Sequence, residues 1–186
     1  MSSRSSPTKR LLRELSAWEK ERETEDGIER LGPVSEDELL RWEAVINGKG
    51  VGSGYDAGRW LLTIVIPPTY PLAPPAIKFA TEIVHANIGL KTGEICLDLL
   101  KDAWTPAYSV LECVRAVRML LSCPEVDSPL NVDVAALLRN SSSSSSGGKG
   151  GGGSGGGGSG GGGGSLAARR LVEYWCQDER GRYDGP

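Results

Sequence analysis

Metal-binding side chains and long apolar runs are both scarce in this sequence. Its 186 residues include one histidine and four cysteines, and no two cysteines have the C-x-x-C spacing of a zinc ribbon. No apolar run approaches the roughly 18–20 residues that a membrane-spanning helix needs. The first residues lack the apolar segment of a secretory signal, and the last three are not an import tripeptide of the Ser-Lys-Leu type. We therefore expect a cytoplasmic protein without a metal site or a structural disulfide.

Basic residues are also in deficit, and they are unevenly placed. The net charge is −3. Residues 1–22 carry six basic and three acidic side chains, whereas residues 23–140 carry ten basic and seventeen acidic ones. An acidic body does not suit the phosphate backbone of a nucleic acid, so we expect no nucleic-acid partner.

The hydrophobic pattern predicts one helix, then four strands, then further helices. Leu11, Leu15 and Trp18 recur at helical spacing behind Pro7, which suits a first helical turn. Apolar and β-branched residues then concentrate in four stretches that we expect to be strands: residues 28–33, 40–46, 60–66 and 76–79. The short links between them indicate an antiparallel meander, so the expected fold class is α+β.

Two further segments have readable local structure. Residues 67–75 contain five prolines and predict a rigid turn with Tyr70 packed inward. Ser109 and Glu112 have the spacing of a capping box at the start of a largely apolar helix. Cys113 lies within that helix and is expected to be a core thiol. Residues 132–138 predict a short helix after it.

Composition divides the chain into three parts. Residues 1–140 hold all the predicted core elements. Residues 141–165 consist of serine, glycine and a single lysine, which cannot form a packed core and predict a disordered linker. Residues 166–186 begin with a short amphipathic helix and end in a polar tail. The sequence does not say whether this helix docks on the core.

Reactive side chains concentrate between residues 85 and 106. This part of the chain contains three short motifs: His85-Ala86-Asn87, then Gly93-Glu94-Ile95-Cys96-Leu97-Asp98, then Trp104-Thr105-Pro106. A cysteine is a strong nucleophile that forms a thioester without a metal. A nearby asparagine amide can donate a hydrogen bond to an oxyanion. The motifs therefore predict acyl-transfer chemistry centred on Cys96.

These motifs resemble the active-site signature of ubiquitin-conjugating enzymes, in which His-Pro-Asn precedes Gly-x-Ile-Cys-Leu-Asp and Trp-Ser/Thr-Pro. The Tyr-Pro-x-x-Pro-Pro form of the turn at residues 67–75 resembles a second family signature. Ala86 departs from the pattern, because the family has proline there. The spacing from Asn87 to Cys96 is also one residue longer than is commonest, and this loop is similar to that of the peroxisomal member. The resemblance covers roughly residues 8–140.

The resemblance implies roles for the residues of these motifs. Cys96 would accept ubiquitin as a thioester. Asn87 would either stabilise the oxyanion or hold the backbone turn, and both alternatives stay open. His85 would form hydrogen bonds within its loop, the alternative being a general base of a cysteine protease. Asp98 would hold its loop through its carboxylate.

Asp127 and Ser128 lie in a loop that the family places beside the catalytic cysteine. Many members carry an acid there that orients or deprotonates an incoming lysine, and alignment on Ser128-Pro129-Leu130 puts serine at that position. We expect an acceptor that needs less help from a base. A cysteine thiol fits, with a reference pKa near 8.5 against about 10.4 for lysine.

Lys9 and Arg10 are the residues of the first helix expected to bind partners. In the family this helix meets the ubiquitin-activating enzyme and the RING-type ligase. A solvated basic face without a binding role is the alternative interpretation. The positions of Lys9 and Arg10 do not distinguish the partner-binding interpretation from the solvated one.

The function implied by the resemblance is that of a ubiquitin carrier. The peroxisomal likeness adds the import receptor as acceptor during its recycling. It also adds a peroxin-22-like membrane anchor, which would recruit the protein to the cytosolic face of the peroxisomal membrane. No cofactor is expected, because ATP is used by the activating enzyme. The alternatives are a ubiquitin-conjugating enzyme of another pathway and a non-catalytic adapter of the same fold, against which Cys96 argues.

Overall fold

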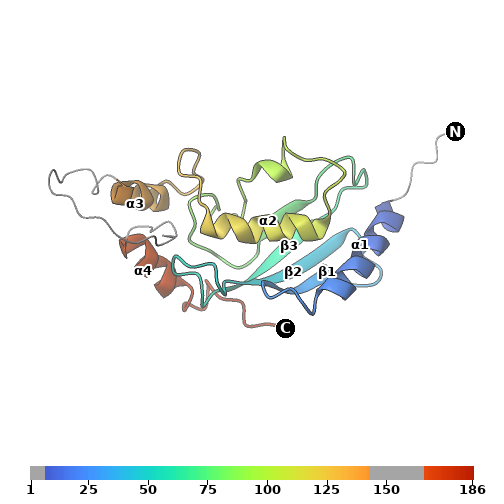
Figure 1. Cartoon of the computed structure of the whole chain (residues 1–186), viewed down its shortest axis with the longest axis horizontal. Coiled ribbons are helices and arrows are strands. Elements are labelled where there is room, and N and C mark those ends of the chain that lie inside the picture. Colours follow the sequence, from blue (N-terminus) through green and yellow to red (C-terminus); the bar gives the residue numbers. More distant parts are fainter. Residues whose placement is uncertain (1–6, 143–165) are drawn as a thin grey trace, which may run out of the picture.

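The computed structural model describes residues 7–142 and 166–186. Its elements are α1 (Pro7–Glu21), β1 (Ile28–Pro33), β2 (Arg41–Asn47), β3 (Arg59–Val65), β4 (Ala76–Phe79), the 3-10 helix η1 (Asp98–Leu100), α2 (Val110–Ser122), α3 (Val132–Ser142) and α4 (Leu166–Trp175). Figure 1 shows α2 across one face of the sheet, α1 at one end, and α3 with α4 at the other.

The four strands form one antiparallel sheet in the order β1-β2-β3-β4. The predicted meander and α+β fold class are confirmed. Trp60, Leu62 and Ile64 of β3 are buried on the inner face, whereas Thr63 and Val65 are exposed on the outer face. This alternation arises because successive side chains of a strand point to opposite faces.

Helix α2 packs on the inner face of the sheet and fills the core. Its capping box forms as predicted: Glu112 N donates to Ser109 Oγ at 3.2 Å, and Ser109 N donates to Glu112 Oε2 at 2.7 Å. Cys113 is fully buried, and burial raises the pKa of its thiol to about 12. The thiol is therefore part of the core, as expected from the sequence.

The proline-rich turn is attached to α1 through Tyr70. Its side chain is buried, and its hydroxyl donates to Glu14 Oε1 at 2.6 Å. Burial, together with the neighbouring Glu14 carboxylate, raises the pKa of the Tyr70 hydroxyl. The predicted inward packing of this tyrosine is confirmed.

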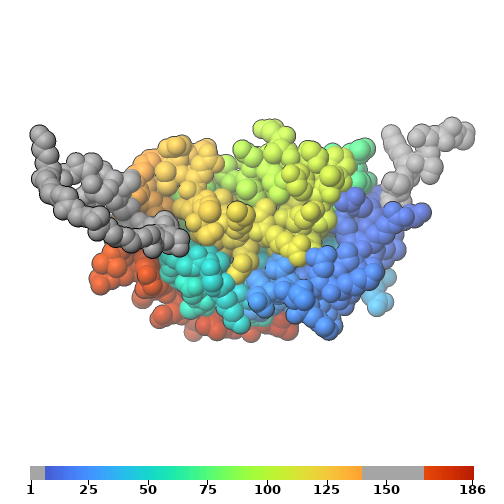
Figure 2. All heavy atoms as spheres, in the orientation of Figure 1, coloured from blue at the N-terminus to red at the C-terminus, as the bar shows by residue number. Residues whose placement is uncertain are grey.

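The C-terminal segment docks on the core, a point that the sequence left open. Ala168, Val172 and Cys176 are buried. Arg59 Nη1 donates to Tyr183 O at 2.8 Å and to Gly185 O at 2.6 Å. Figure 2 shows this segment, in red, along the lower edge of the molecule. The predicted C-terminal helix therefore packs against the core domain.

The helix predicted over residues 132–138 is longer in the structure. Helix α3 continues to Ser142, two residues into the predicted tract. Residues 143–165, the rest of that tract, lie outside the described residues. No helix among those described is long and apolar enough to cross a membrane.

Candidate active site

Cys96 follows a tight turn that leaves its thiol half-buried. Cys96 N donates to Asn87 O at 2.9 Å, and Gly89 N donates to Glu94 O at 2.9 Å. Gly93 has φ +65°, and a Cβ there would lie 1.9 Å from Phe79 O, so the turn requires glycine. Ile95 points into the core, which directs the next residue towards the surface.

All four cysteines are free thiols, but they differ in exposure. Cys113 and Cys176 are buried, whereas Cys123 is exposed at the end of α2. Burial raises the pKa of the Cys176 thiol to about 11. Cys96 is thus the accessible thiol that lies within the reactive motifs.

His85 is held by two hydrogen bonds and is buried. Its Nδ1 accepts from Asn87 N at 3.1 Å, so its Nε2 carries the proton and donates to Leu120 O at 3.0 Å. Burial lowers the pKa of His85 to about 4. The neutral ring has no free nitrogen for proton transfer, which favours the structural role over that of a general base.

Asn87 is fully buried and its amide faces the loop that follows α2. Its Nδ2 donates to Glu125 O at 2.7 Å and to Ser128 O at 3.5 Å, while its Oδ1 accepts from Glu125 N at 2.8 Å. The two short bonds, both to Glu125, hold the amide against this loop. The geometry favours the backbone-holding role.

Ala86 is buried where the family signature has proline. Its carbonyl accepts from Leu130 N at 2.8 Å and from Asn131 N at 2.9 Å. Hydrogen bonds to the same loop thus hold this turn in place of a proline ring. Together, Ala86 and Asn87 bind the 125–131 loop to the segment that carries Cys96.

The remaining loop residues of the predicted site are exposed. The side chains of Asp127 and Ser128 lie on the surface of the 125–131 loop. Asp98 is also exposed, and its carboxylate makes no hydrogen bond within the described chain. Its backbone oxygen instead accepts from Lys101 N at 2.9 Å and Ala103 N at 3.0 Å. The peptide group of Asp98 thus closes this loop, and a loop-holding role of its carboxylate stays a prediction.

The two candidate partner-binding residues of α1 point in different directions. Lys9 is exposed and lines a shallow groove with Leu12 and Arg13. Arg10 turns inward: its Nε is 2.5 Å from Glu14 Oε1, and its Nη2 donates to Tyr108 O at 2.9 Å. Arg10 thus joins α1 to the segment before α2, and its role in partner binding stays a prediction.

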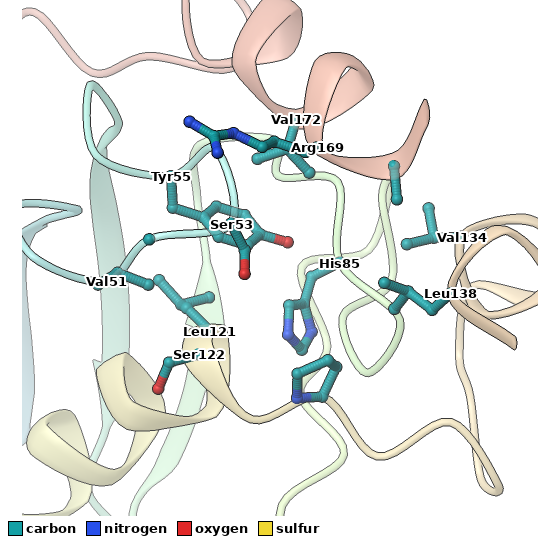
Figure 3. Close-up of a pocket in the computed structure, with 13 residues that line it drawn as sticks. Val51, Ser53, Tyr55, His85, Leu121, Ser122, Val134, Leu138, Arg169 and Val172 are labelled. Carbon is teal, nitrogen blue, oxygen red and sulfur yellow. The ribbon is translucent and has the colours of Figure 1, made fainter. Parts of the chain in front are cut away.

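A cavity of about 390 Å³ lies behind the motifs, between the core and the C-terminal helices. Figure 3 shows Tyr55, His85, Val172 of α4 and Val134 of α3 around it. Cys96 does not line it. The sequence could not indicate this cavity, because its outer wall exists only once α4 has docked.

Lys101 is a site residue that the motifs did not single out. Its Nζ lies 3.8 Å from Cys96 Sγ. The two residues are five positions apart, and η1 between them turns the chain back. A lysine at that spacing carries no signal in the sequence itself.

Comparison with known proteins agrees with the signature. The profile of the family described as Ubiquitin-conjugating enzyme matches residues 10–146. The chain is 62% identical over 181 residues to Ubiquitin-conjugating enzyme E2 PEX4 of Gibberella zeae, covering 97% of this chain and 92% of that protein. It is 39% identical over 131 residues to Protein PEROXIN-4 of Arabidopsis thaliana, covering 70% of this chain and 82% of that protein.

A solved structure shares the fold over nearly its whole length. It is the H. polymorpha ubiquitin conjugating enzyme Pex4p in complex with the soluble domain of Pex22p. The TM-score is 0.72 at 33% identity, with 90% of this chain and 94% of that chain covered.

Proposed function

Because this chain belongs to the ubiquitin-conjugating enzyme family, we propose that Cys96 is the residue on which it carries ubiquitin. The Cys96 thiol loses its proton and attacks the thioester carbonyl of ubiquitin on the activating enzyme, whose cysteine leaves with the electron pair of the broken C–S bond and takes up a proton. An acceptor nucleophile then attacks the Cys96 thioester and loses its proton. The new acyl bond forms as the Cys96 sulfur leaves.

The observation that carries this proposal is the placement of Cys96. Its thiol is half-buried on the surface, its backbone is fixed by Asn87, and the adjoining loop is bound to the same segment. A nucleophile so placed is accessible to a large partner and still fixed in position. An adapter without enzymatic activity needs no such thiol, so this alternative is disfavoured.

We further propose that the acceptor is the peroxisomal import receptor, modified on a cysteine. The support is the relationship to proteins named PEX4 and PEROXIN-4. A Pex22-like membrane anchor would bring the protein to the cytosolic face of the peroxisomal membrane, as suggested by the H. polymorpha complex. Asp127 and Ser128 are exposed on the adjoining loop, where they can meet an acceptor.

A charging assay tests the first proposal. The protein is incubated with activating enzyme, ATP and ubiquitin, and the products are run on a non-reducing gel. We expect a thiol-sensitive adduct with the wild type and with Cys123→Ser, the matched exposed control. Cys96→Ser should give a thiol-resistant adduct or none. A thiol-sensitive adduct that survives Cys96→Ser would show that another cysteine carries ubiquitin.

The acceptor is tested with the charged protein and the purified receptor. Receptor ubiquitination should be lost when the receptor's accessible cysteines are replaced, and should persist when its lysines are replaced. The opposite pattern would contradict cysteine as the acceptor and favour an enzyme of another pathway. Addition of the soluble part of the anchor shows whether the anchor is needed for transfer.

A further inference from the structure

A positive charge lies next to the nucleophile of the proposed reaction. Lys101 Nζ is 3.8 Å from Cys96 Sγ. The backbone between the two is closed by hydrogen bonds from Leu100 N to Leu97 O at 3.0 Å and from Lys101 N to Asp98 O at 2.9 Å. The backbone at Lys101 is therefore fixed relative to the Cys96 sulfur.

The far side of this loop is attached to the body of the protein. Trp104 Nε1 donates to Pro71 O at 2.9 Å, and Trp104 N donates to Lys101 O at 3.3 Å. The Trp104 ring also packs against Tyr70, with the ring centroids 5.9 Å apart. Hydrogen bonds on both sides of Lys101 thus fix the backbone that carries it.

The charge of Lys101 is not neutralised by an ion pair. Within residues 7–142 and 166–186, no carboxylate lies at ion-pair distance from its ammonium. Two other lysines near the motifs are paired, Lys78 with Glu94 at 3.2 Å and Lys91 with Glu82 at 2.8 Å. The ammonium beside the sulfur therefore remains available to a developing negative charge.

Negative charge develops at this place when the thioester reacts. The acceptor's attack turns the carbonyl oxygen into an oxyanion, and the sulfur then leaves with the electrons of the C–S bond. The Asn87 amide faces the 125–131 loop, where its Nδ2 donates to Glu125 O at 2.7 Å and lies 3.5 Å from Ser128 O. The carbonyl carbon is bonded directly to the sulfur, so its oxygen comes within reach of a lysine already 3.8 Å from that sulfur.

We propose that Lys101 is a catalytic residue that stabilises the oxyanion and the departing sulfur during discharge of the Cys96 thioester. Lysine suits this task, since its compact ammonium on a flexible stem can follow the charge from sulfur to oxygen. The proposal rests on Cys96 being the carrier of ubiquitin. It assigns to a cation one of the two roles that the signature leaves open for Asn87.

Single-turnover discharge tests this role. Wild type, Lys101→Gln and Lys101→Arg are charged with ubiquitin, the activating enzyme is stopped, and hydroxylamine is added as a small neutral nucleophile. Loss of the thioester is followed on a non-reducing gel. We expect Lys101→Gln to discharge about tenfold more slowly, equivalent to about 1.4 kcal/mol. Lys101→Arg should stay within about threefold of wild type. The control Lys20→Gln, which replaces an exposed lysine of α1, should discharge at the wild-type rate.

Salt separates an electrostatic role from a structural one. The Debye length falls from about 8 Å at 0.15 M to about 3 Å at 1 M ionic strength. The difference between wild type and Lys101→Gln should therefore shrink in 1 M salt, while the melting temperatures of the two proteins agree.

Three results would overturn the proposal. The first is equal discharge of wild type and Lys101→Gln at 0.15 M salt. The second is a difference that persists in 1 M salt and is not restored by Lys101→Arg, since that pattern indicates a structural role. The third is the absence of any Cys96 thioester, which would overturn the carrier function as well, whereas the first two leave it standing.

Discussion

Replacing Asn87 with alanine separates a backbone-holding role from a direct role in chemistry. The substitution removes two short hydrogen bonds, from Nδ2 to Glu125 O at 2.7 Å and from Glu125 N to Oδ1 at 2.8 Å. Neutral hydrogen bonds contribute about 1 kcal/mol each, so the free energy of unfolding should fall by about 2 kcal/mol. For a domain of this size that corresponds to a decrease of roughly 4–8 °C in melting temperature.

The loop itself should report the change. Hydrogen exchange at the Glu125 amide should become faster in Asn87→Ala, because its acceptor is gone. Discharge of the thioester to hydroxylamine should stay within about threefold of wild type. Asn131→Ala is the matched control, since its Oδ1 accepts from Val134 N at 3.2 Å in the same loop but outside the segment of Cys96.

The opposite pattern would refute this reasoning about Asn87. Loss of an oxyanion donor typically lowers a rate about 10²–10³-fold. If Asn87→Ala kept the stability and the Glu125 exchange rate of wild type and yet discharged that slowly, its amide would be acting on the reacting atoms. The hydrogen bonds to the loop would then have to break during the reaction.

Three other substitutions test the packing around the site. Gly93→Ala should destabilise the protein by several kcal/mol more than Gly50→Ala in denaturant unfolding, because both glycines have positive φ but only the first would place Cβ against a carbonyl of β4. Val172→Ala should lower the free energy of unfolding by about 2 kcal/mol, because Val172 is only 5% exposed. Leu171→Ala should lower it by under about 0.5 kcal/mol, because Leu171 is 37% exposed. Equal losses for the two variants would contradict the docking of α4. The folded-state pKa of His85 is about 4 and lies below its ordinary value of 6.5, so the unfolded chain binds the proton more readily. Its contribution to stability is complete above about pH 6.5 and is lost as the pH falls towards 4, and His85→Gln should flatten this part of the stability profile.

Local patterns were sufficient to predict most of the fold. β1 and β4 have the predicted limits, and β2 and β3 begin and end within one residue of them. The capping box also formed as predicted, because Ser109 and Glu112 are only three positions apart in the sequence. Such features depend on neighbours along the chain, which a sequence displays directly.

Features that depend on distant partners were not predictable in the same way. Asn87 forms hydrogen bonds with Glu125, 38 positions away, and neither residue type indicates that the two are partners. Arg10 could be assigned to a basic face but not to the carbonyl of Tyr108. The apolar stripe of α4 indicated that one face would be buried without saying against what. In each case the residue type determines which kind of interaction is possible, and the three-dimensional fold determines which residue is the partner.

The attachment of the C-terminal segment has a consequence for the order of synthesis. Arg59 of β3 cannot form its hydrogen bond to Tyr183 O until that residue, 124 positions later, has been synthesised. The sheet and α2 leave the ribosome before α4 exists, and residues 143–186 take roughly 2–9 s to add at 5–20 residues per second. During that interval the apolar surface around Tyr55, which α4 later covers, faces solvent or a chaperone. A chain truncated before residue 166 would contain all its signature motifs and leave that surface uncovered.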